Sequence, residues 1–342
     1  MHKYQTLLCV GVTLFAFVGL VGCGGATLPN SASSSSSGSS SSNSSSSGSS
    51  SSGAISAIEH AFFVGNTSTS GEVRNDFNQY WNQITPELEG KWTSVESLRD
   101  IYNWNALDRT YNYAKQNGIL FKQSSFVWGA SAQAWLINLS ASETAEEIEE
   151  WISEFCNRYP DTDMIDVVNE ATPGHYPASF ARKAFGENWI TKVFQLARQH
   201  CPRSVLILND YYIISWDHEK FITMAKPIVQ SGYVDVLGLQ AHGLEDFSAE
   251  QIKSRLDNLW DQLHVPMYIT EYDLNISDDE KQLQQIQAQF PVFYNHPHVK
   301  GITLWGYIYG KTWVPSSGLI RQDGTFRPAM TWLMNYIKQN PK

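Results

Sequence analysis

The chain has 342 residues and a formal net charge of −10, and no segment concentrates Lys and Arg. This balance argues against a nucleic-acid partner and against attraction to an anionic membrane surface, whereas it allows a neutral polymer as partner. Aromatic residues make up 13% of the chain and include 12 Trp, which either a sugar-binding cleft or an aromatic core would explain.

Residues 1–22 predict a leader for export. A basic residue, Lys3, precedes an apolar run over 7–20, which is too short and Gly-rich for a membrane span of about 20 residues. The run ends in Leu-Val-Gly before Cys23, and this ending resembles a bacterial lipobox. The resemblance implies that Cys23 becomes the lipidated first residue of the mature chain. In the alternative, the leader is an ordinary one that is cleaved nearby, and Cys23 has no role.

Residues 23–53 predict a lipid-anchored, flexible tether. Residues 31–53 are almost entirely Ser with interspersed Gly, a composition that cannot bury a core. Gly24 follows the cysteine where an Asp would favour inner-membrane retention, and this resembles lipoproteins sorted to the outer membrane. We therefore expect a folded domain over 54–342, held at the cell surface or outer membrane of a Gram-negative bacterium and touching the membrane only through its lipid.

From residue 55 onward, short apolar strands alternate with amphipathic helices. The clearest helix is expected over 143–159, where apolar residues share one face and Ser140 with Glu143 supplies a capping box. Eight strand–helix units predict an α/β fold, the (β/α)8 TIM barrel. The alternative, an open doubly wound sheet, would show a Gly-rich phosphate loop after an early strand, and the sequence has none. The strands are expected at 61–65, 81–85, 120–127, 164–168, 205–208, 236–239, 267–270 and 301–304.

Four cysteines are present, of which Cys9 lies in the leader and Cys23 at the lipobox. Cys156 and Cys201 remain, each near the end of an expected helix. In an exported protein they either form a disulfide or stay as two buried free thiols. No Cys/His spacing resembles a zinc site, and we expect no metal and no other cofactor.

Two of the expected strands end in a glutamate. The run 164–170 ends in Asn169 and Glu170, and the run 266–271 ends in Glu271. A carboxylate at the carboxyl end of a barrel strand lies where barrel enzymes place their chemistry. Two such groups suggest a glycosidase, in which one carboxyl group protonates the leaving oxygen and the other attacks the sugar carbon.

The chain resembles glycoside hydrolase family 10, the retaining endo-β-1,4-xylanases, from about residue 60 to the C-terminus. The segments DVVNE at 166–170 and ITE at 269–271 resemble the two catalytic signatures of the family, and their separation is close to the family's. The pair Gln240-x-His242 and the segment from Trp305 to Trp313 also match, in the same order. Five matches in order make the resemblance specific.

The resemblance assigns roles to these residues. Glu170 would be the general acid/base and Glu271 the nucleophile, with carboxyl groups about 5–5.5 Å apart. Negative charge on Glu271 would raise the pKa of Glu170 towards the working pH. Asn169 would bind the sugar 2-hydroxyl, and His242 would hold Glu271, with Gln240 beside it. The other expected substrate contacts are Glu87 and Lys91 on the glycone side, Trp128, Trp305 and Trp313 around subsites −1 and −2, and Tyr211 on the leaving-group side.

Four positions depart from the family on the glycone side. Leu88 stands where the family usually has Asn, Ser124 and Gly129 where it has His, and Ser131 where it often has Gln. Each lost hydrogen bond to sugar costs about 0.5–1.5 kcal/mol. Such losses either weaken transition-state binding or admit a decorated backbone sugar.

Three functions follow from these patterns. The first is a surface-anchored endo-β-1,4-xylanase that acts as a monomer on xylan or xylo-oligosaccharides. A xylan-binding lipoprotein with attenuated catalysis would explain the altered glycone side, although both carboxylates remain. A glycosidase specific for a decorated xylan, or for a different β-1,4-glycan, would explain Leu88 and Ser124.

Overall fold

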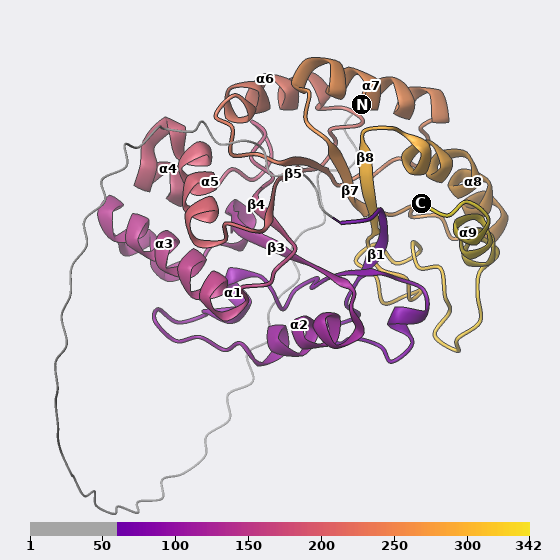
Figure 1. Ribbon diagram of the computed structural model, residues 1–342, viewed down its shortest axis with the longest axis horizontal. Coiled ribbons are helices and arrows are strands. Elements are labelled where there is room, and N and C mark those ends of the chain that lie inside the picture. Colours follow the sequence, from indigo (N-terminus) through magenta and orange to yellow (C-terminus); the bar gives the residue numbers. More distant parts are fainter. Residues whose placement is uncertain (1–59) are drawn as a thin grey trace, which may run out of the picture. The chain divides into compact units, whose positions relative to one another are not determined.

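The computed structural model describes residues 60–342. The predicted leader, the lipid site at Cys23 and the serine-rich tether lie outside these residues. In the described part, parallel strands close into a barrel in chain order, from β1 to β8 (Figure 1). The predicted (β/α)8 barrel is confirmed. The strands are β1 Phe63–Thr67, β2 Gln83–Thr85, β3 Leu120–Trp128, β4 Met164–Asn169, β5 Val205–Asp210, β6 Val236–Leu239, β7 Met267–Tyr272 and β8 Val299–Leu304.

Helices surround the barrel and connect its strands (Figure 1). The helix expected over 143–159 is α3, and it begins two residues earlier, at Ala141. It does so because the Ser140 side chain accepts from the Glu143 N–H, while the Glu143 side chain accepts from the Ser140 N–H. The helices are α1 Trp92–Val95, α2 Asn105–Asn117, α3 Ala141–Arg158, α4 Ser179–Phe185, α5 Trp189–His200, α6 His218–Val229, α7 Ala249–Leu263, α8 Asp279–Asn295 and α9 Pro328–Gln339.

A disulfide joins the C-terminal end of α3 to the residue that follows α5. It links Cys156 to Cys201, whose Cα atoms lie 5.4 Å apart. Of the two states that the sequence left open for these cysteines, the structure has the disulfide. Within residues 60–342, no helix is both long and apolar enough to cross a membrane.

The interior of the barrel is layered. An apolar cluster that includes Phe63 and Met164 fills the end where the strands begin. Gly301 is needed there, because a Cβ atom on it would lie 2.2 Å from the Phe63 ring. Further along the strands, Lys122 and Asp166 form an ion pair of 2.6 Å, with both side chains fully buried. The floor of the opposite end of the barrel is therefore polar and charged.

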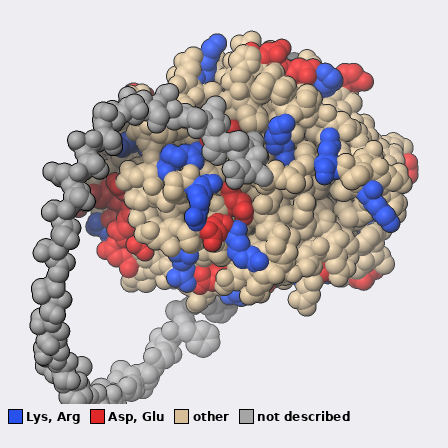
Figure 2. Space-filling model, in the orientation of Figure 1, with Lys and Arg blue, Asp and Glu red and all other residues tan. Residues whose placement is uncertain are grey.

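Acidic and basic side chains both occur on the face of the domain that Figure 2 shows, and the basic ones are spread over it. The surface on this side shows no extended basic field of the kind that binds nucleic acid.

Candidate active site

The two predicted glutamates lie at the same end of the barrel, where the strands finish. Glu170 follows β4 and Glu271 lies near the end of β7, and their exposed fractions are 8% and 6%. Glu170 has φ 57°, a region that non-glycine residues rarely adopt. Its N–H donates to the Asn209 carbonyl, and its own carbonyl accepts from the Tyr176 N–H. These bonds hold the turn that places its carboxyl group at the barrel mouth.

An irregularity in β7 turns Glu271 into the barrel. Pairing between β7 and β8 shifts between Ile269 and Tyr272. Asn209 then reaches two consecutive residues of β7, since Thr270 Oγ1 donates to its Oδ1 at 2.6 Å and its Nδ2 donates to Glu271 Oε1 at 2.9 Å. Regular alternation would place Thr270 and Glu271 on opposite faces, so the shift is what brings the carboxylate into the site.

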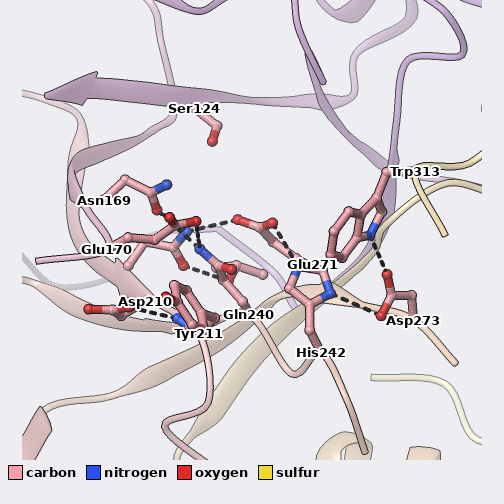
Figure 3. A network of polar contacts seen from close by, with 12 residues as sticks. Ser124, Asn169, Glu170, Asp210, Tyr211, Gln240, His242, Glu271, Asp273 and Trp313 are labelled. Carbon is pink, nitrogen blue, oxygen red and sulfur yellow. Dashed lines mark hydrogen bonds and ion pairs between the residues drawn. The ribbon is translucent and has the colours of Figure 1, made fainter. Parts of the chain in front are cut away.

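An amide network connects the two glutamates (Figure 3). Asn169 Oδ1 accepts from Asn209 Nδ2 at 2.8 Å and from Gln240 Nε2 at 3.2 Å. Gln240 Nε2 also donates to Glu170 Oε1 at 3.1 Å. Gln240 was expected beside His242 and Glu271, whereas its amide serves Glu170 and Asn169. Because both bonds use the oxygen of Asn169, its Nδ2 donors are left for a ligand hydroxyl.

Glu170 lies in surroundings that favour its protonated form. Burial raises its pKa to about 7, and the negative charge of Glu271 acts in the same direction. Hydrogen bonds from Gln240 and from Trp128, whose Nε1 lies 2.7 Å from Glu170 Oε2, only partly oppose this rise. Trp128 was expected as a wall of the cleft, and the structure adds this bond to the carboxyl group.

Glu271 lies in surroundings that favour its ionised form. Burial would raise its pKa, but the bond with His242 and the charges of His242, Lys122 and Lys91 hold it below its usual value. His242 Nε2 lies 3.1 Å from Glu271 Oε2. The prediction that His242 holds Glu271 therefore agrees with the geometry.

His242 is itself held by a second carboxylate. Its Nδ1 lies 2.9 Å from Asp273 Oδ1, and Asp273 Oδ2 accepts from Trp313 Nε1 at 2.6 Å (Figure 3). Although burial lowers the pKa of His242, Asp273 and Glu271 raise it to about 10. The imidazole is therefore a cation at neutral pH, and it donates from both nitrogens.

Lys91 and Trp128, which were expected on the glycone side, lie close together beside Ser124. Lys91 Nζ donates to Ser124 Oγ at 3.3 Å and lies 5.1 Å from the centre of the Trp128 ring. Burial lowers the pKa of Lys91, and burial raises that of Glu87 to about 7. Leu88 is 58% exposed, so its side chain points away from the core.

Trp305 and Trp313, two of the three tryptophans expected around subsites −1 and −2, differ in exposure. Trp305 is 7% exposed, which makes it part of the packed wall beneath the cleft. Trp313 is 55% exposed and packs edge-on against His242, with ring centres 5.0 Å apart. The Trp313 side chain is therefore accessible beside His242, whereas Trp305 offers little surface.

At two of the four positions that depart from the family pattern, Gly129 and Ser131, neighbouring protein atoms contact the residue. A Cβ atom on Gly129 would lie 2.4 Å from the Tyr176 carbonyl oxygen and 2.6 Å from that of Pro177. The Gly129 N–H also donates to the Tyr176 carbonyl. Ser131 Oγ lies 2.7 Å from Thr93 Oγ1. Gly129 therefore opens no space for sugar, because the loop that follows Glu170 packs directly on it.

Tyr211, expected on the leaving-group side, belongs to a cluster built around a histidine. His175 Nδ1 lies 2.6 Å from Asp210 Oδ1, and its Nε2 lies 3.1 Å from Asp217 Oδ2. Its ring stacks on Tyr211, with centres 3.8 Å apart. Thr172 completes the group, donating from its N–H and its hydroxyl to Asp210 Oδ2. The His175 ring, fixed by the two aspartates, therefore packs against one face of Tyr211.

The sequence of the domain matches a known family. The family model described as glycosyl hydrolase family 10 covers residues 49–336. The chain belongs to glycosyl hydrolase family 10.

Curated relatives resemble this chain in sequence, and a solved structure resembles it in fold. Endo-1,4-beta-xylanase B of Cellvibrio japonicus is 60% identical over 278 residues, which are 81% of this chain but 46% of that protein. Endo-1,4-beta-xylanase 3 of Hypocrea jecorina is 28% identical over 254 residues, 72% of each chain. Native xylanase 10B from Thermotoga maritima has the same fold, with TM-score 0.73, 24% identity and coverage of 81% of this chain and 95% of that one.

Three site residues of this family 10 domain escaped prediction from sequence. Asp273 lies two residues after Glu271, and strand alternation could have placed both on one face. Asn209 is the second-last residue of β5 and pairs in register with Asn169, the last residue of β4, and that repeated position was an available signal. His175 had no such signal, because its partners lie elsewhere in the chain, Asp210 at the end of β5 and Asp217 just before α6.

One group of carboxylates among residues 60–342 lies close enough to share a metal ion. It comprises Glu96, Asp100 and Glu147. Glu96 already accepts from Trp92 Nε1 and from the Asp100 N–H, and Glu147 pairs with Arg99. These contacts give the carboxylates of this group a structural role.

Proposed function

We propose that the domain hydrolyses internal β-1,4-xylosidic bonds of xylan with retention of configuration. The observation that carries the proposal is the pair of buried carboxyl groups at the barrel mouth, whose pKa values are displaced in opposite directions. One is suited to donate a proton near neutral pH and the other to attack as an anion. Similar proteins are named endo-1,4-beta-xylanases, which supports xylan as the substrate.

In the first step, Glu170 gives its proton to the glycosidic oxygen while Glu271 attacks the anomeric carbon. The bond to the leaving sugar breaks, and an ester bond forms between Glu271 and the remaining sugar. Retention by this route requires carboxyl groups about 5–5.5 Å apart. Asn169 Nδ2 donates to the sugar 2-hydroxyl, since Asn209 and Gln240 occupy its oxygen.

In the second step, water cleaves the ester. The negative charge of Glu271 is absent in the ester, so one cause of the high pKa of Glu170 is removed. Glu170 then takes a proton from water, and the hydroxide attacks the anomeric carbon. The reaction returns both carboxyl groups to their starting states and needs no metal or other cofactor.

Substrate binding is divided between the two sides of the cleft. We assign Glu87, Lys91, Trp128 and Trp313 to the glycone side, with Trp305 as supporting wall, and Tyr211 to the leaving-group side. Leu88 adds an exposed apolar surface on the glycone side. This surface favours tolerance of a decorated xylan, which remains the second candidate function.

Product analysis tests the proposal. Purified residues 54–342 would be incubated with linear xylan and with arabinoxylan, beside the Glu271→Ala protein. Short xylo-oligosaccharides from the wild type alone would support the endo-xylanase, and faster release from arabinoxylan would support the decorated substrate. Binding without products on either polymer would favour the xylan-binding lipoprotein. Sedimentation of the same protein checks the proposed monomer.

We also propose that Cys23 anchors the chain to the outer membrane after removal of residues 1–22. The lipobox-like sequence and the serine-rich tether support this. Labelled palmitate added to a Gram-negative host expressing the full chain should appear in the wild-type protein and be absent from Cys23→Ser. Equal labelling of the two proteins, or label in neither, would contradict the anchor.

A further inference from the structure

The loop that follows Glu170 is bonded both to itself and to the end of β5. The Glu170 carbonyl accepts from the Tyr176 N–H at 3.0 Å, and the Thr172 carbonyl accepts from the His175 N–H at 2.9 Å. Thr172 also donates from its N–H and its hydroxyl to Asp210 Oδ2, at 2.9 and 2.6 Å. These bonds set the path of the chain directly after the acid/base.

His175 ties this loop to two further points of the chain. Its Nδ1 lies 2.6 Å from Asp210 Oδ1, and its Nε2 lies 3.1 Å from Asp217 Oδ2. Asp217 is held in turn, because its N–H donates to the Tyr212 carbonyl and its Oδ1 accepts from Lys220. The His175 side chain is only 4% exposed, so solvent is largely excluded from both contacts. One imidazole therefore joins the loop to the last residue of β5 and to the residue before α6.

The imidazole of His175 carries a positive charge. A neutral ring has one N–H donor and one bare lone pair, and a lone pair that faced a carboxylate would be repelled. Because a carboxylate oxygen lies at each nitrogen, both nitrogens donate. Although burial lowers the pKa of His175, the bonds and charges of Asp210 and Asp217 raise it above its usual value. The other titratable groups around the ring are two tyrosines that pack on it and a lysine beyond Asp217, namely Tyr211, Tyr212 and Lys220.

We propose that His175 is a positioning residue for the acid/base: as a cation between Asp210 and Asp217, it locks the turn that aims the Glu170 carboxyl group. This inference rests on the proposed function, and it assigns a residue that acts through the loop rather than on the substrate. Glu170 has φ 57°, and such a conformation persists only where the surrounding contacts over-determine it. The contacts of Thr172 and His175 with Asp210 are of this kind.

Loss of the lock should affect proton transfer more than substrate binding. A displaced Glu170 protonates the leaving oxygen poorly in the first step and activates water poorly in the second. A strongly acidic phenol leaves without a proton, so it avoids the first loss but not the second. The ester with Glu271 then accumulates, and kcat and KM fall together. A residue that only supported the Tyr211 ring for binding would raise KM and treat all phenols alike.

The test uses aryl β-xylobiosides that differ only in the acidity of the phenol. In His175→Ala, the ratio of kcat/KM for the most acidic phenol to that for the least acidic should rise about tenfold above the wild-type ratio. This is a part of the roughly 10²–10⁴-fold that a general acid supplies. On the most acidic phenol, kcat and KM should both fall. His175→Gln keeps one N–H donor and should return part of the way to the wild-type ratio. An unchanged ratio in His175→Ala overturns the proposal.

Two further variants make the result specific. His200, the last residue of α5, also lies beside a carboxylate, with its Nε2 3.3 Å from Glu149 Oε1, and His200→Ala should leave the ratio unchanged. Asp217→Asn removes one of the two anions that hold the cation. It should raise the ratio by about threefold, the size of one hydrogen bond. If His175→Ala does not fold, Asp217→Asn decides in its place, and an unchanged ratio there overturns the proposal.

Failure of the proposed function is distinguishable from failure of this inference. If wild-type protein cleaves none of the xylobiosides, crystal structures of the wild type and of His175→Ala are compared, with Asp217→Asn as substitute where the alanine variant does not fold. A Glu170 carboxyl group displaced from Trp128 Nε1 and Gln240 Nε2 in the variant supports the lock. A carboxyl group that keeps both bonds overturns it.

Discussion

The two glutamates at the barrel mouth are nearly equally buried, yet their surroundings differ in charge. Around Glu170 lie neutral donors, Gln240 and Trp128, and the negative charges of Glu271 and Asp210. Around Glu271 lie the cations of His242, Lys122 and Lys91. Burial alone would raise both pKa values, so the neighbouring charges decide which carboxyl group keeps its proton.

The largest expected effect follows from removing the nucleophile. Glu271→Ala should lower kcat by more than about 10⁴-fold, because no ester can form. Added azide should then restore cleavage of an activated aryl xyloside and give the α-glycosyl azide, identified by NMR. A folded variant that azide does not rescue, or that stays active, would contradict the nucleophilic role.

Removing the acid should produce a loss that depends on the leaving group. Glu170→Gln should lower kcat/KM on xylo-oligosaccharides by about 10²–10⁴-fold, since the departing sugar needs a proton. An aryl xyloside with a strongly acidic phenol should lose far less. Wild-type kcat/KM should fall as pH rises through about 7, where Glu170 loses its proton. Equal losses on both substrates would argue against the acid role.

The same variant should be more stable than the wild type in alkaline buffer. A carboxyl group whose pKa is raised on folding holds its proton where the unfolded chain has lost it, so stability falls as pH rises from about 4.5 to about 7. At pH 8 the cost is on the order of 3 kcal/mol, which glutamine avoids. Thermal unfolding should show the gain at pH 8 and little gain at pH 4. A gain of the same size at both pH values would contradict the linkage.

Removing the cation beside the nucleophile should move the acidic limb of the activity profile. In His242→Asn, Glu271 loses a hydrogen bond and a neighbouring positive charge, so its pKa rises. We expect the acidic limb of kcat/KM to shift upward by at least about one pH unit, equivalent to about 1.4 kcal/mol. Lys253→Ala, at an exposed ion pair far from the mouth, serves as control. An unmoved limb would show that His242 does not set the charge of Glu271.

The smallest effect on activity is expected from removal of the disulfide, which links α3 to the residue that follows α5. Cys156→Ser with Cys201→Ser should lower the free energy of unfolding by about 2–4 kcal/mol. Neither limb of the pH profile should move, because no charge near either glutamate changes. Denaturant unfolding and the pH profile measure the two quantities, and a displaced basic limb would mean that the disulfide also positions Glu170.

The sequence predicted the barrel well because apolar runs mark buried strands directly. The expected strands begin and end within two residues of the observed ones. Several observed strands continue past the last apolar residue, as β5 does to Asp210, since backbone pairing does not require an apolar side chain. Both glutamates and most of the residues expected around them could be proposed from sequence because they lie at strand ends or in recognisable motifs, and the structure places the two glutamates at the same end of the barrel.

Partners across the barrel could not be predicted in the same way. The family resemblance placed Gln240 beside His242, but its amide reaches Glu170, which follows β4. His175, in the loop that follows Glu170, meets Asp210 at the end of β5 only through tertiary packing. Such contacts depend on barrel curvature and loop path, which periodicity does not encode.

Gly129 limits how this cleft can be redesigned. Introducing the histidine that the family usually has there would collide with two main-chain carbonyl groups, and no rotamer change relieves a clash with backbone. The loop bearing Tyr176 and Pro177 would have to be rebuilt together with position 129. The two changes are therefore strongly non-additive, and a library that varies one position at a time would not find the combination.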